Sequence, residues 1–143
     1  MEENKEYRPT LALNEKGVPA ALDLAAAIYH VLDRHKADNI TVEFVGDQIN
    51  LTDYFVICSA KSNTHVRALA DEVDYRLGLA GVKVDNREGK GDGNSWIVLD
   101  YINVMVHIFT PEARQQYNLE KLYPDAKKVE IGPDPDEVPA EQA

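Results

Sequence analysis

The sequence has 143 residues, which suits one domain because single domains span about 100 to 200 residues. Hydrophobic residues make up 44% and charged residues 28%, a balance that predicts a packed core and excludes a disordered chain. The net charge is −10 and the basic residues are dispersed, which disfavours direct binding to nucleic acid phosphates. If the partner is a nucleic acid machine, we expect contact through one of its basic proteins.

The chain also lacks signals for export or membrane insertion. No apolar stretch approaches the roughly 18 consecutive residues of a membrane span. The start, Met1 to Thr10, has neither the basic nor the apolar region of a secretory signal. Cys58 is the only cysteine and lies in an apolar run, so it predicts a buried, inert thiol rather than a disulfide. We therefore expect a cytoplasmic protein.

Hydrophobic periodicity predicts both helices and strands. Apolar residues recur every three or four positions within 22–32 and 66–77, as in amphipathic helices. Residues 40–45 alternate as in a half-buried strand, whereas 54–58 are continuously β-branched or aromatic, as in a central strand. In chain order we predict an extended leader (1–19), a helix (20–36), strands (40–45 and 54–58), a helix that follows the caps of 59–64 and ends at Gly78 or Gly81, a short strand (82–85), a glycine-rich loop (87–95), a β-hairpin (96–100 with 104–109), a last helical segment (111–123) and a tail (132–143).

This order predicts an α/β fold in which residues 20–131 form one domain with a single mixed β-sheet of about five strands. Residues 132–143 contain three prolines, four carboxylates and no cation. Such a segment cannot bury enough apolar area to offset its ordering entropy, so we expect an acidic, disordered tail.

The glycine-rich loop contains Arg87-Glu88-Gly89-Lys90-Gly91-Asp92-Gly93, in which backbone amides could approach an anion. A phosphate loop needs Gly-x-x-x-x-Gly-Lys-Ser/Thr leading into a helix. This loop carries two acids and leads into a strand, so we favour a plain connection.

Catalytic and metal-binding residue types do not form a known pattern. The four histidines lack the four-residue helical step of a zinc site, and no cysteine cluster supports them. Ser59, Asp53 and His107 include the types of a nucleophilic triad, but the Gly-x-Ser-x-Gly elbow is missing. No predicted strand carries the Asp-x-Asp pair that clamps metal ions for phosphoryl transfer. We expect no enzyme activity, no metal and no cofactor.

The predicted hairpin has two unlike faces because side chains alternate along a strand. One face carries Ile97, Leu99, Tyr101, Val104, Val106 and Ile108, as expected beneath helices. The other carries Trp96, Val98, Asp100, Asn103, Met105, His107 and Phe109. This second composition is typical of the centre of protein interfaces, where aromatic residues and methionine are enriched. The alternative is that a helix covers this face as well.

Several motifs resemble the signature of the Iojap-related ribosomal silencing factor family, in the family's order over roughly residues 22–126. The matching residues are Leu51-Thr52-Asp53-Tyr54-Phe55-Val56-Ile57-Cys58-Ser59 with Ser62 and Val66, Glu88-Gly89, Trp96-Ile97-Val98-Leu99-Asp100-Tyr101, Val104 to Phe109, and Arg114-x-x-Tyr117-x-Leu119-Glu120-x-Leu122.

The resemblance implies a mixed-sheet fold akin to nucleotidyltransferases but without catalytic residues, often seen as a homodimer. It implies binding to ribosomal protein L fourteen of the large ribosomal subunit, where the small subunit would dock. Occupying that surface blocks subunit joining and represses translation when nutrients are short. Organelle relatives act in ribosome assembly.

By matching motif positions, the resemblance also implies a set of partner-binding residues. We expect Trp96 and Phe109 to supply contact area, and Asp100 and Glu88 to face basic side chains. The full set is Glu88, Trp96, Val98, Asp100, Tyr101, Met105, His107, Phe109 and Tyr117.

Three positions depart from the family pattern, which usually has glycine at Ala60, Gly-Asp at Ile102-Asn103 and tryptophan at Tyr123. Alanine and isoleucine resist positive φ, so the first two changes predict altered loop geometry only. Tyr123 keeps an aromatic ring.

Two further functions stay open. An assembly factor for the large subunit would keep the same partner and act at a different time. An enzyme of nucleotidyltransferase type would bind nucleotide and magnesium. If the aromatic face also makes a homodimer, self-association would compete with ribosome binding.

Overall fold

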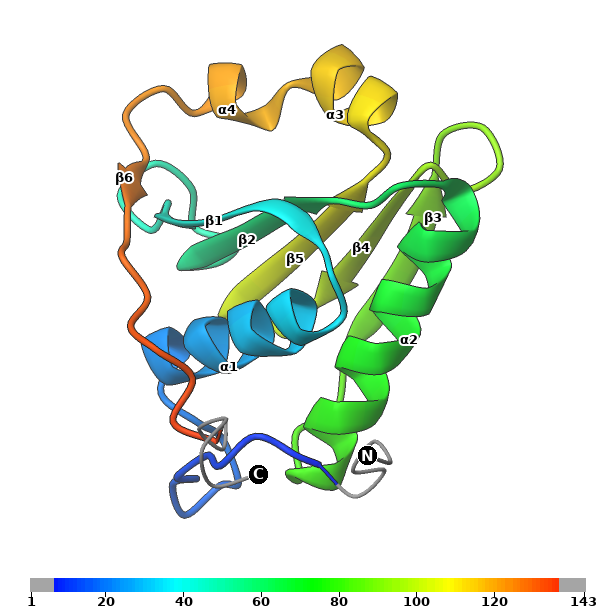
Figure 1. Ribbon diagram of the computed structural model, residues 1–143. Coiled ribbons are helices and arrows are strands. Elements are labelled where there is room, and N and C mark those ends of the chain that lie inside the picture. Colours follow the sequence, from blue (N-terminus) through cyan, green and yellow to red (C-terminus); the bar gives the residue numbers. More distant parts are fainter. Residues whose placement is uncertain (1–6, 137–143) are drawn as a thin grey trace.

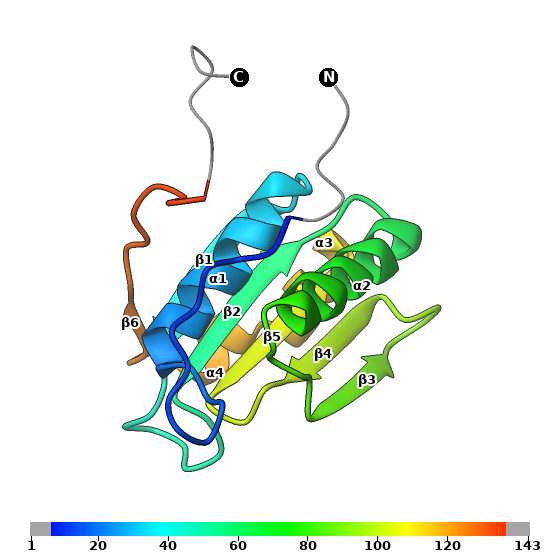
Figure 2. The ribbon, with the colours of Figure 1, turned by 90° about the horizontal axis from the view of Figure 1, so that it is seen from below.

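The computed structural model describes residues 7–136, which form a six-stranded mixed sheet with helices on both faces (Figures 1 and 2). In chain order the elements are α1 (Ala21–Arg34), β1 (Asp38–Phe44), β2 (Tyr54–Ser59), α2 (Asn63–Leu79), β3 (Asn86–Lys90), β4 (Trp96–Asp100), β5 (Val104–Phe109), α3 (Pro111–Tyr117), α4 (Leu119–Leu122) and β6 (Lys127–Lys128).

The strands lie in the order β3-β4-β5-β2-β1-β6. β2 and β5 pair in parallel, and all other neighbours pair antiparallel. β2 and β5 occupy the middle of the sheet, which explains their continuous apolar sequences, because both faces of a central strand are covered. The α/β class and the single mixed sheet are confirmed.

The main core lies between the sheet and the helices α1 and α2, which run across the same face (Figure 2). The predicted helical stripes are buried here, including Leu24, Ile28, Leu69 and Leu77. α2 begins where Ser62 caps it, since the Ser62 hydroxyl accepts a hydrogen bond from the His65 N–H at 3.1 Å. Both long helices are therefore confirmed close to their predicted bounds.

The opposite face of the sheet is only partly covered. The short helices α3 and α4 cross one end of it (Figure 1), and a smaller apolar cluster forms beneath them. That cluster consists of Val45, Phe55, Ile57, Phe109, Ala113 and Leu119. It covers β1, β2 and the end of β5, so most of the outer face of β3 and β4 has no helix over it.

Three predicted elements differ from the structure. Residues 82–85 do not form a strand, and β3 lies instead at Asn86–Lys90, which overlaps the first half of the predicted loop 87–95. β6 adds a sixth strand of two residues. The last helical segment is divided at Asn118, whose φ of 44° ends α3, while its side chain caps α4 by accepting from the Lys121 N–H at 3.2 Å.

The two ends of the described chain pack on the domain. Pro9 is buried, and Tyr7 and Leu11 contact the main core. Asp134 and Asp136 form hydrogen bonds to Arg34 and Thr10, so residues 132–136 differ from the predicted disorder. The remaining residues of the leader and tail predictions, 1–6 and 137–143, lie outside the described residues.

Candidate protein-binding face

Strand register sets the side chains of the outer face in rows. Trp96 pairs with Phe109, Val98 with His107, and Asp100 with Met105 across β4 and β5. The edge strand β3 extends these rows, because Lys90, Glu88 and Asn86 pair with Trp96, Val98 and Asp100, respectively. The outer face therefore combines aromatic, aliphatic and acidic side chains, as the alternation of the hairpin predicts.

Six predicted partner-binding residues reach the surface on this side. Trp96, Val98, Asp100 and Met105 are partly exposed, Glu88 is exposed, and Tyr117 of α3 is 36% exposed. We call these six residues the open-sheet patch. Its middle is aromatic and aliphatic and its rim carries carboxylates, an arrangement that suits a partner with apolar and basic groups.

Trp96 is the centre of an aromatic stack. Its ring lies 4.9 Å from the Phe109 ring and 4.7 Å from the Tyr117 ring, measured between centroids. The Lys90 ammonium lies 5.4 Å from the Trp96 ring centroid, within range of a cation–π contact. Contacts on several sides hold the indole in one orientation before any partner binds, which lowers the entropy lost on binding.

The structure corrects the expectation that Phe109 offers contact area. Its ring is 0% exposed because Trp96 stacks on it and the Ala113 and Leu119 side chains share its cluster. Phe109 thus supports Trp96 from below and does not itself meet a partner.

His107 is also buried, with 5% exposure. Its Nδ1 accepts a hydrogen bond from Trp96 Nε1 at 3.2 Å, so the imidazole proton sits on Nε2. That Nε2 has no hydrogen-bond partner among residues 7–136, and the Phe55 ring lies 4.6 Å from the imidazole centroid. Burial, with a smaller effect of the Lys90 charge, lowers the pKa of His107 to about 3. His107 is a neutral support for Trp96.

Tyr101 lies on the other face of the sheet, with 6% exposure, in the main core beneath the helices. Burial raises the pKa of its phenol. The strand alternation predicts this side, whereas the family resemblance places Tyr101 among the partner-binding residues. Because Tyr101 lies on the helix-covered face of the sheet, its side chain cannot contact a partner bound at the open-sheet patch.

The turn between β4 and β5 fixes the Asp100 carboxylate. Asp100 Oδ1 accepts the Ile102 N–H at 2.7 Å, and the Tyr101 N–H donates to the Val104 carbonyl at 2.9 Å. Ile102 adopts a φ of 75° despite its β-branched side chain, while Ala60 keeps a negative φ. The predicted altered loop geometry is therefore absent at Ile102, which takes a conformation that glycine adopts more easily.

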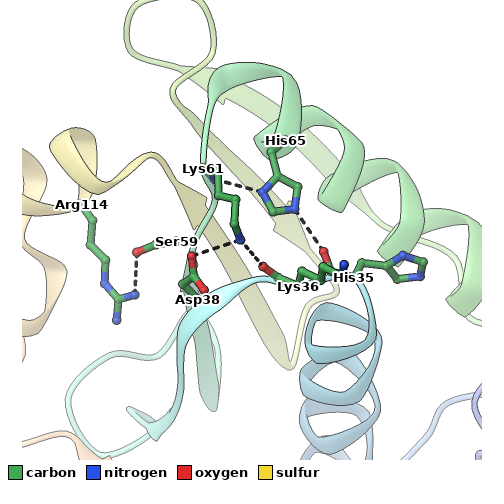
Figure 3. A network of polar contacts seen from close by, with 7 residues as sticks. All are labelled: His35, Lys36, Asp38, Ser59, Lys61, His65 and Arg114. Carbon is green, nitrogen blue, oxygen red and sulfur yellow. Dashed lines mark hydrogen bonds and ion pairs between the residues drawn. The ribbon is translucent and has the colours of Figure 1, made fainter.

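A polar network surrounds the end of β2 and joins the helix layer to α3 (Figure 3). His65 Nδ1 accepts the Lys61 N–H at 3.0 Å, while its Nε2 lies 3.1 Å from the His35 carbonyl oxygen. The Ser59 hydroxyl accepts a hydrogen bond from Arg114 at 3.0 Å. These contacts serve the packing of α2 and α3 against the sheet ends.

The three residues of the nucleophilic triad are separated. Asp53 precedes β2 and Ser59 ends it, so the extended strand holds them roughly 20 Å apart. His107 pairs with Ile57 in the middle of the sheet. Within residues 7–136, no group of three His, Cys, Asp or Glu side chains is arranged to hold a metal ion. None of the helices there has the length and apolar content that crossing a bilayer requires.

The sequence alone did not indicate Lys90 as a neighbour of Trp96. β3 is exposed at all five residues and carries no apolar alternation, so hydrophobic periodicity has nothing to detect. The charged residues of the Arg-Glu-Gly-Lys segment are typical of a protected sheet edge, and they are the sequence feature that indicates an edge strand here.

Together, the mixed sheet and its open aromatic face define a small α/β protein with a candidate surface for binding another macromolecule. The family model described as ribosomal silencing factor during starvation matches residues 18–143. The chain belongs to this ribosomal silencing factor family.

Similar proteins carry consistent names. The chain is 32% identical over 119 residues to the ribosomal silencing factor RsfS of Bacillus subtilis, covering 83% of this chain and 95% of that protein. It is 33% identical over 112 residues to the chloroplastic Iojap protein of Zea mays, covering 77% of this chain and 47% of that protein. A Mus musculus protein named mitochondrial assembly of ribosomal large subunit protein 1 is 32% identical over 96 residues, with coverages of 65% and 42%.

Solved structures show the same fold. A Chromobacterium violaceum protein superposes with a TM-score of 0.70 at 24% identity, covering 82% of this chain and 97% of that one. A Bacillus halodurans protein gives a TM-score of 0.64 at 30% identity, with coverages of 77% and 96%. The names of these relatives refer to ribosomal silencing and to assembly of the large ribosomal subunit. The kinship to nucleotidyltransferases stays a prediction.

Proposed function

We propose that this protein binds ribosomal protein L fourteen on the large ribosomal subunit through the open-sheet patch and sterically blocks subunit joining. It thereby represses translation under nutrient limitation, acts in the cytoplasm and performs no catalysis. The observation that carries the proposal is the group of partly exposed side chains of Trp96, Val98 and Met105 on a sheet face that α3 and α4 leave open, in a chain of this family.

The charge of the patch supports a basic protein as the partner. Glu88 and Asp100 flank the apolar middle, and the whole chain carries a net charge of −10. A surface of this sign attracts basic side chains and speeds their encounter, whereas it repels an RNA backbone. A ribosomal protein surface with Lys or Arg beside an apolar area fits these groups.

Trp96 should supply most of the binding energy, because it is the largest partly exposed side chain of the patch and is held rigid by its stack. Truncating a central aromatic anchor costs at least about 2 kcal/mol, or some thirtyfold in affinity. We expect Trp96→Ala protein to pull down large subunits from lysate that much more weakly than wild-type protein.

Trp96→Ala also removes contacts to Phe109 and His107, so a surface variant is needed beside it. Glu88→Lys changes an exposed carboxylate and should weaken binding without unfolding the chain. Glu15→Lys makes the same charge change on the exposed leader and serves as the matched control. Excess wild-type and Glu15→Lys protein should reduce formation of the full ribosome from purified subunits, and Glu88→Lys less so. If the subunits join normally in the presence of excess wild-type protein, the proposal is wrong.

A role in large-subunit assembly is the second candidate, favoured by the name of the Mus musculus relative. It predicts that a deletion strain accumulates immature large subunits on sucrose gradients. Silencing predicts mature subunits and excess joining during starvation. A homodimer through the same patch would oppose either role, so dilution should increase the fraction of protein able to bind large subunits.

A further inference from the structure

Ile102, in the turn between β4 and β5, is held in a backbone conformation that disfavours it. Its φ is 75°, where a branched Cβ crowds the following carbonyl. The other non-glycine residues with positive φ in residues 7–136 are Lys36, Asn39, Asn94 and Asn118. Three of these are asparagines, which tolerate this region, and Lys36 is not β-branched, so Ile102 is the one β-branched residue of the set.

The turn does not need the isoleucine side chain. Backbone bonds fix it: the Asn103 carbonyl oxygen accepts the N–H groups of Asp53 at 3.1 Å and Tyr54 at 3.2 Å. The Asp100 carboxylate accepts the Ile102 N–H at 2.7 Å. Glycine or asparagine at position 102 would make all these bonds with less steric strain.

The side chain also gains no burial in the folded chain. Ile102 is 59% exposed and belongs to neither apolar cluster of the described residues. A strained, exposed β-branched residue costs stability and returns none within this chain. Strain that the surrounding structure imposes without a local benefit is often found at binding sites.

Ile102 lies next to the open-sheet patch. The adjacent pair Asp100 and Met105 belongs to the patch and closes the same hairpin. Leu51, which is 68% exposed, precedes the Asp53 N–H that bonds to Asn103, so it occupies the same end of the sheet. Exposed apolar side chains therefore occur at the hairpin end of the sheet, beside the Asp100 and Met105 pair of the patch.

We propose that Ile102 extends the open-sheet patch and inserts its side chain into an apolar depression on the basic large-subunit protein. This inference rests on the proposed function and names a further contact residue for it. The occupant is a basic protein because the carboxylates of Asp53 and Asp100 lie at this end of the sheet and Glu88 lies farther along β3, opposite Val98. These charges disfavour both RNA and a second acidic copy of the chain.

Two substitutions of Ile102 test this inference, because each should stabilise the fold and weaken binding. Ile102→Gly and Ile102→Asn relieve the strain, and each should raise the melting temperature by about 3 °C. Both remove the apolar contact and should weaken binding to purified large subunits about tenfold in sedimentation assays. Ile102→Leu keeps an apolar side chain and should bind within about threefold of wild-type protein. Lys36→Gly relieves a φ of 68° in the connection between α1 and β1, outside the patch, so it should raise the melting temperature and leave binding unchanged.

The outcomes separate this inference from the proposed function. If Trp96→Ala weakens binding but both Ile102 variants bind as wild-type protein does, Ile102 is no contact residue and the proposed function stands. If the Ile102 variants change only self-association in analytical ultracentrifugation, the occupant is a second copy and the inference is wrong. If wild-type protein does not bind large subunits at all, both the proposed function and the Ile102 contact are wrong.

Discussion

At the scale of single residues, His107 is a titratable side chain whose role in the structure is to hold Trp96 in place. It accepts the Trp96 indole N–H and keeps that ring in place over Phe109. Its position in the middle of the sheet leaves no room for a hydrated imidazolium, which is why burial lowers its pKa to about 3. The orientation of Trp96 therefore depends on His107 staying neutral.

This predicts a specific loss of stability in acid. In the unfolded chain His107 has a pKa near 6.5 and binds a proton below that pH, whereas in the folded chain it stays neutral down to about pH 3. The free energy of unfolding is therefore highest above pH 6.5 and decreases as the pH falls from 6.5 toward 3. Between pH 7 and pH 5 the loss from this group is about 2 kcal/mol. His107→Gln keeps an acceptor for Trp96 and cannot titrate. Urea unfolding at both pH values should show a smaller loss for His107→Gln than for wild-type protein. Equal losses would mean that His107 titrates normally in the folded state.

At the scale of elements, buried periodicity decided what could be predicted. The two long helices, β1, β2 and the hairpin each bury an apolar face, so the sequence carries their period. β3 is exposed throughout and β6 has two residues, so neither carries one. The division of the last helical segment depends on the positive φ of Asn118, which periodicity cannot indicate.

The same reasoning separates what could be predicted of the site. Alternation along the hairpin correctly assigned Trp96, Val98 and Met105 to the outer face. It could not show that α3 and α4 would cover the far end of that face and bury Phe109, because this depends on where the chain folds back after β5. Burial within a face is a tertiary property, whereas the choice of face is local.

Arg114 connects these short helices to the sheet. Its guanidinium donates to Glu120 at 2.9 Å and to the Asn39 carbonyl oxygen at 2.7 Å. It also donates to the Ser59 hydroxyl at 3.0 Å (Figure 3). Arg114→Met removes the donor to the buried Ser59 hydroxyl and the partly buried Glu120 carboxylate, and it should lower the free energy of unfolding by about 2–3 kcal/mol. Because Trp96 is the only tryptophan and packs against Tyr117 of α3, its fluorescence should also shift to the red.

The matched control for Arg114→Met is Arg67→Met. Arg67 is exposed on α2, so its loss should change the free energy of unfolding by less than about 0.5 kcal/mol. Similar values for the two variants in urea unfolding would show that Arg114 does not hold α3 and α4 on the sheet.

At the scale of the whole molecule, the two ends of the described chain meet beside α1. The Thr10 hydroxyl donates to Asp136 at 2.7 Å, and Arg34 Nε donates to Asp134 at 2.7 Å. The Arg34 guanidinium lies 3.7 Å from the centroid of the Tyr7 ring. We call these five residues the terminal clasp. It lies on the helix-covered side of the sheet (Figure 2), away from the open-sheet patch.

The clasp should open locally when its charge pair is removed. Burial raises the pKa of Asp134, but the hydrogen bonds from Arg34 and the Asp136 N–H outweigh this effect and hold the pKa below its ordinary value. The carboxylate is therefore ionised and hydrogen-bonded at neutral pH. Asp134→Asn weakens a charge-assisted hydrogen bond, and amides of residues 7–13 and 130–136 should exchange with deuterium about tenfold faster. The Glu130→Gln control removes an exposed carboxylate nearby and should leave these rates unchanged. The strands should keep their protection, and large-subunit binding should not change, because the clasp and the patch lie on opposite faces. Faster exchange in the strands of Asp134→Asn protein would instead mean that the chain ends stabilise the whole domain.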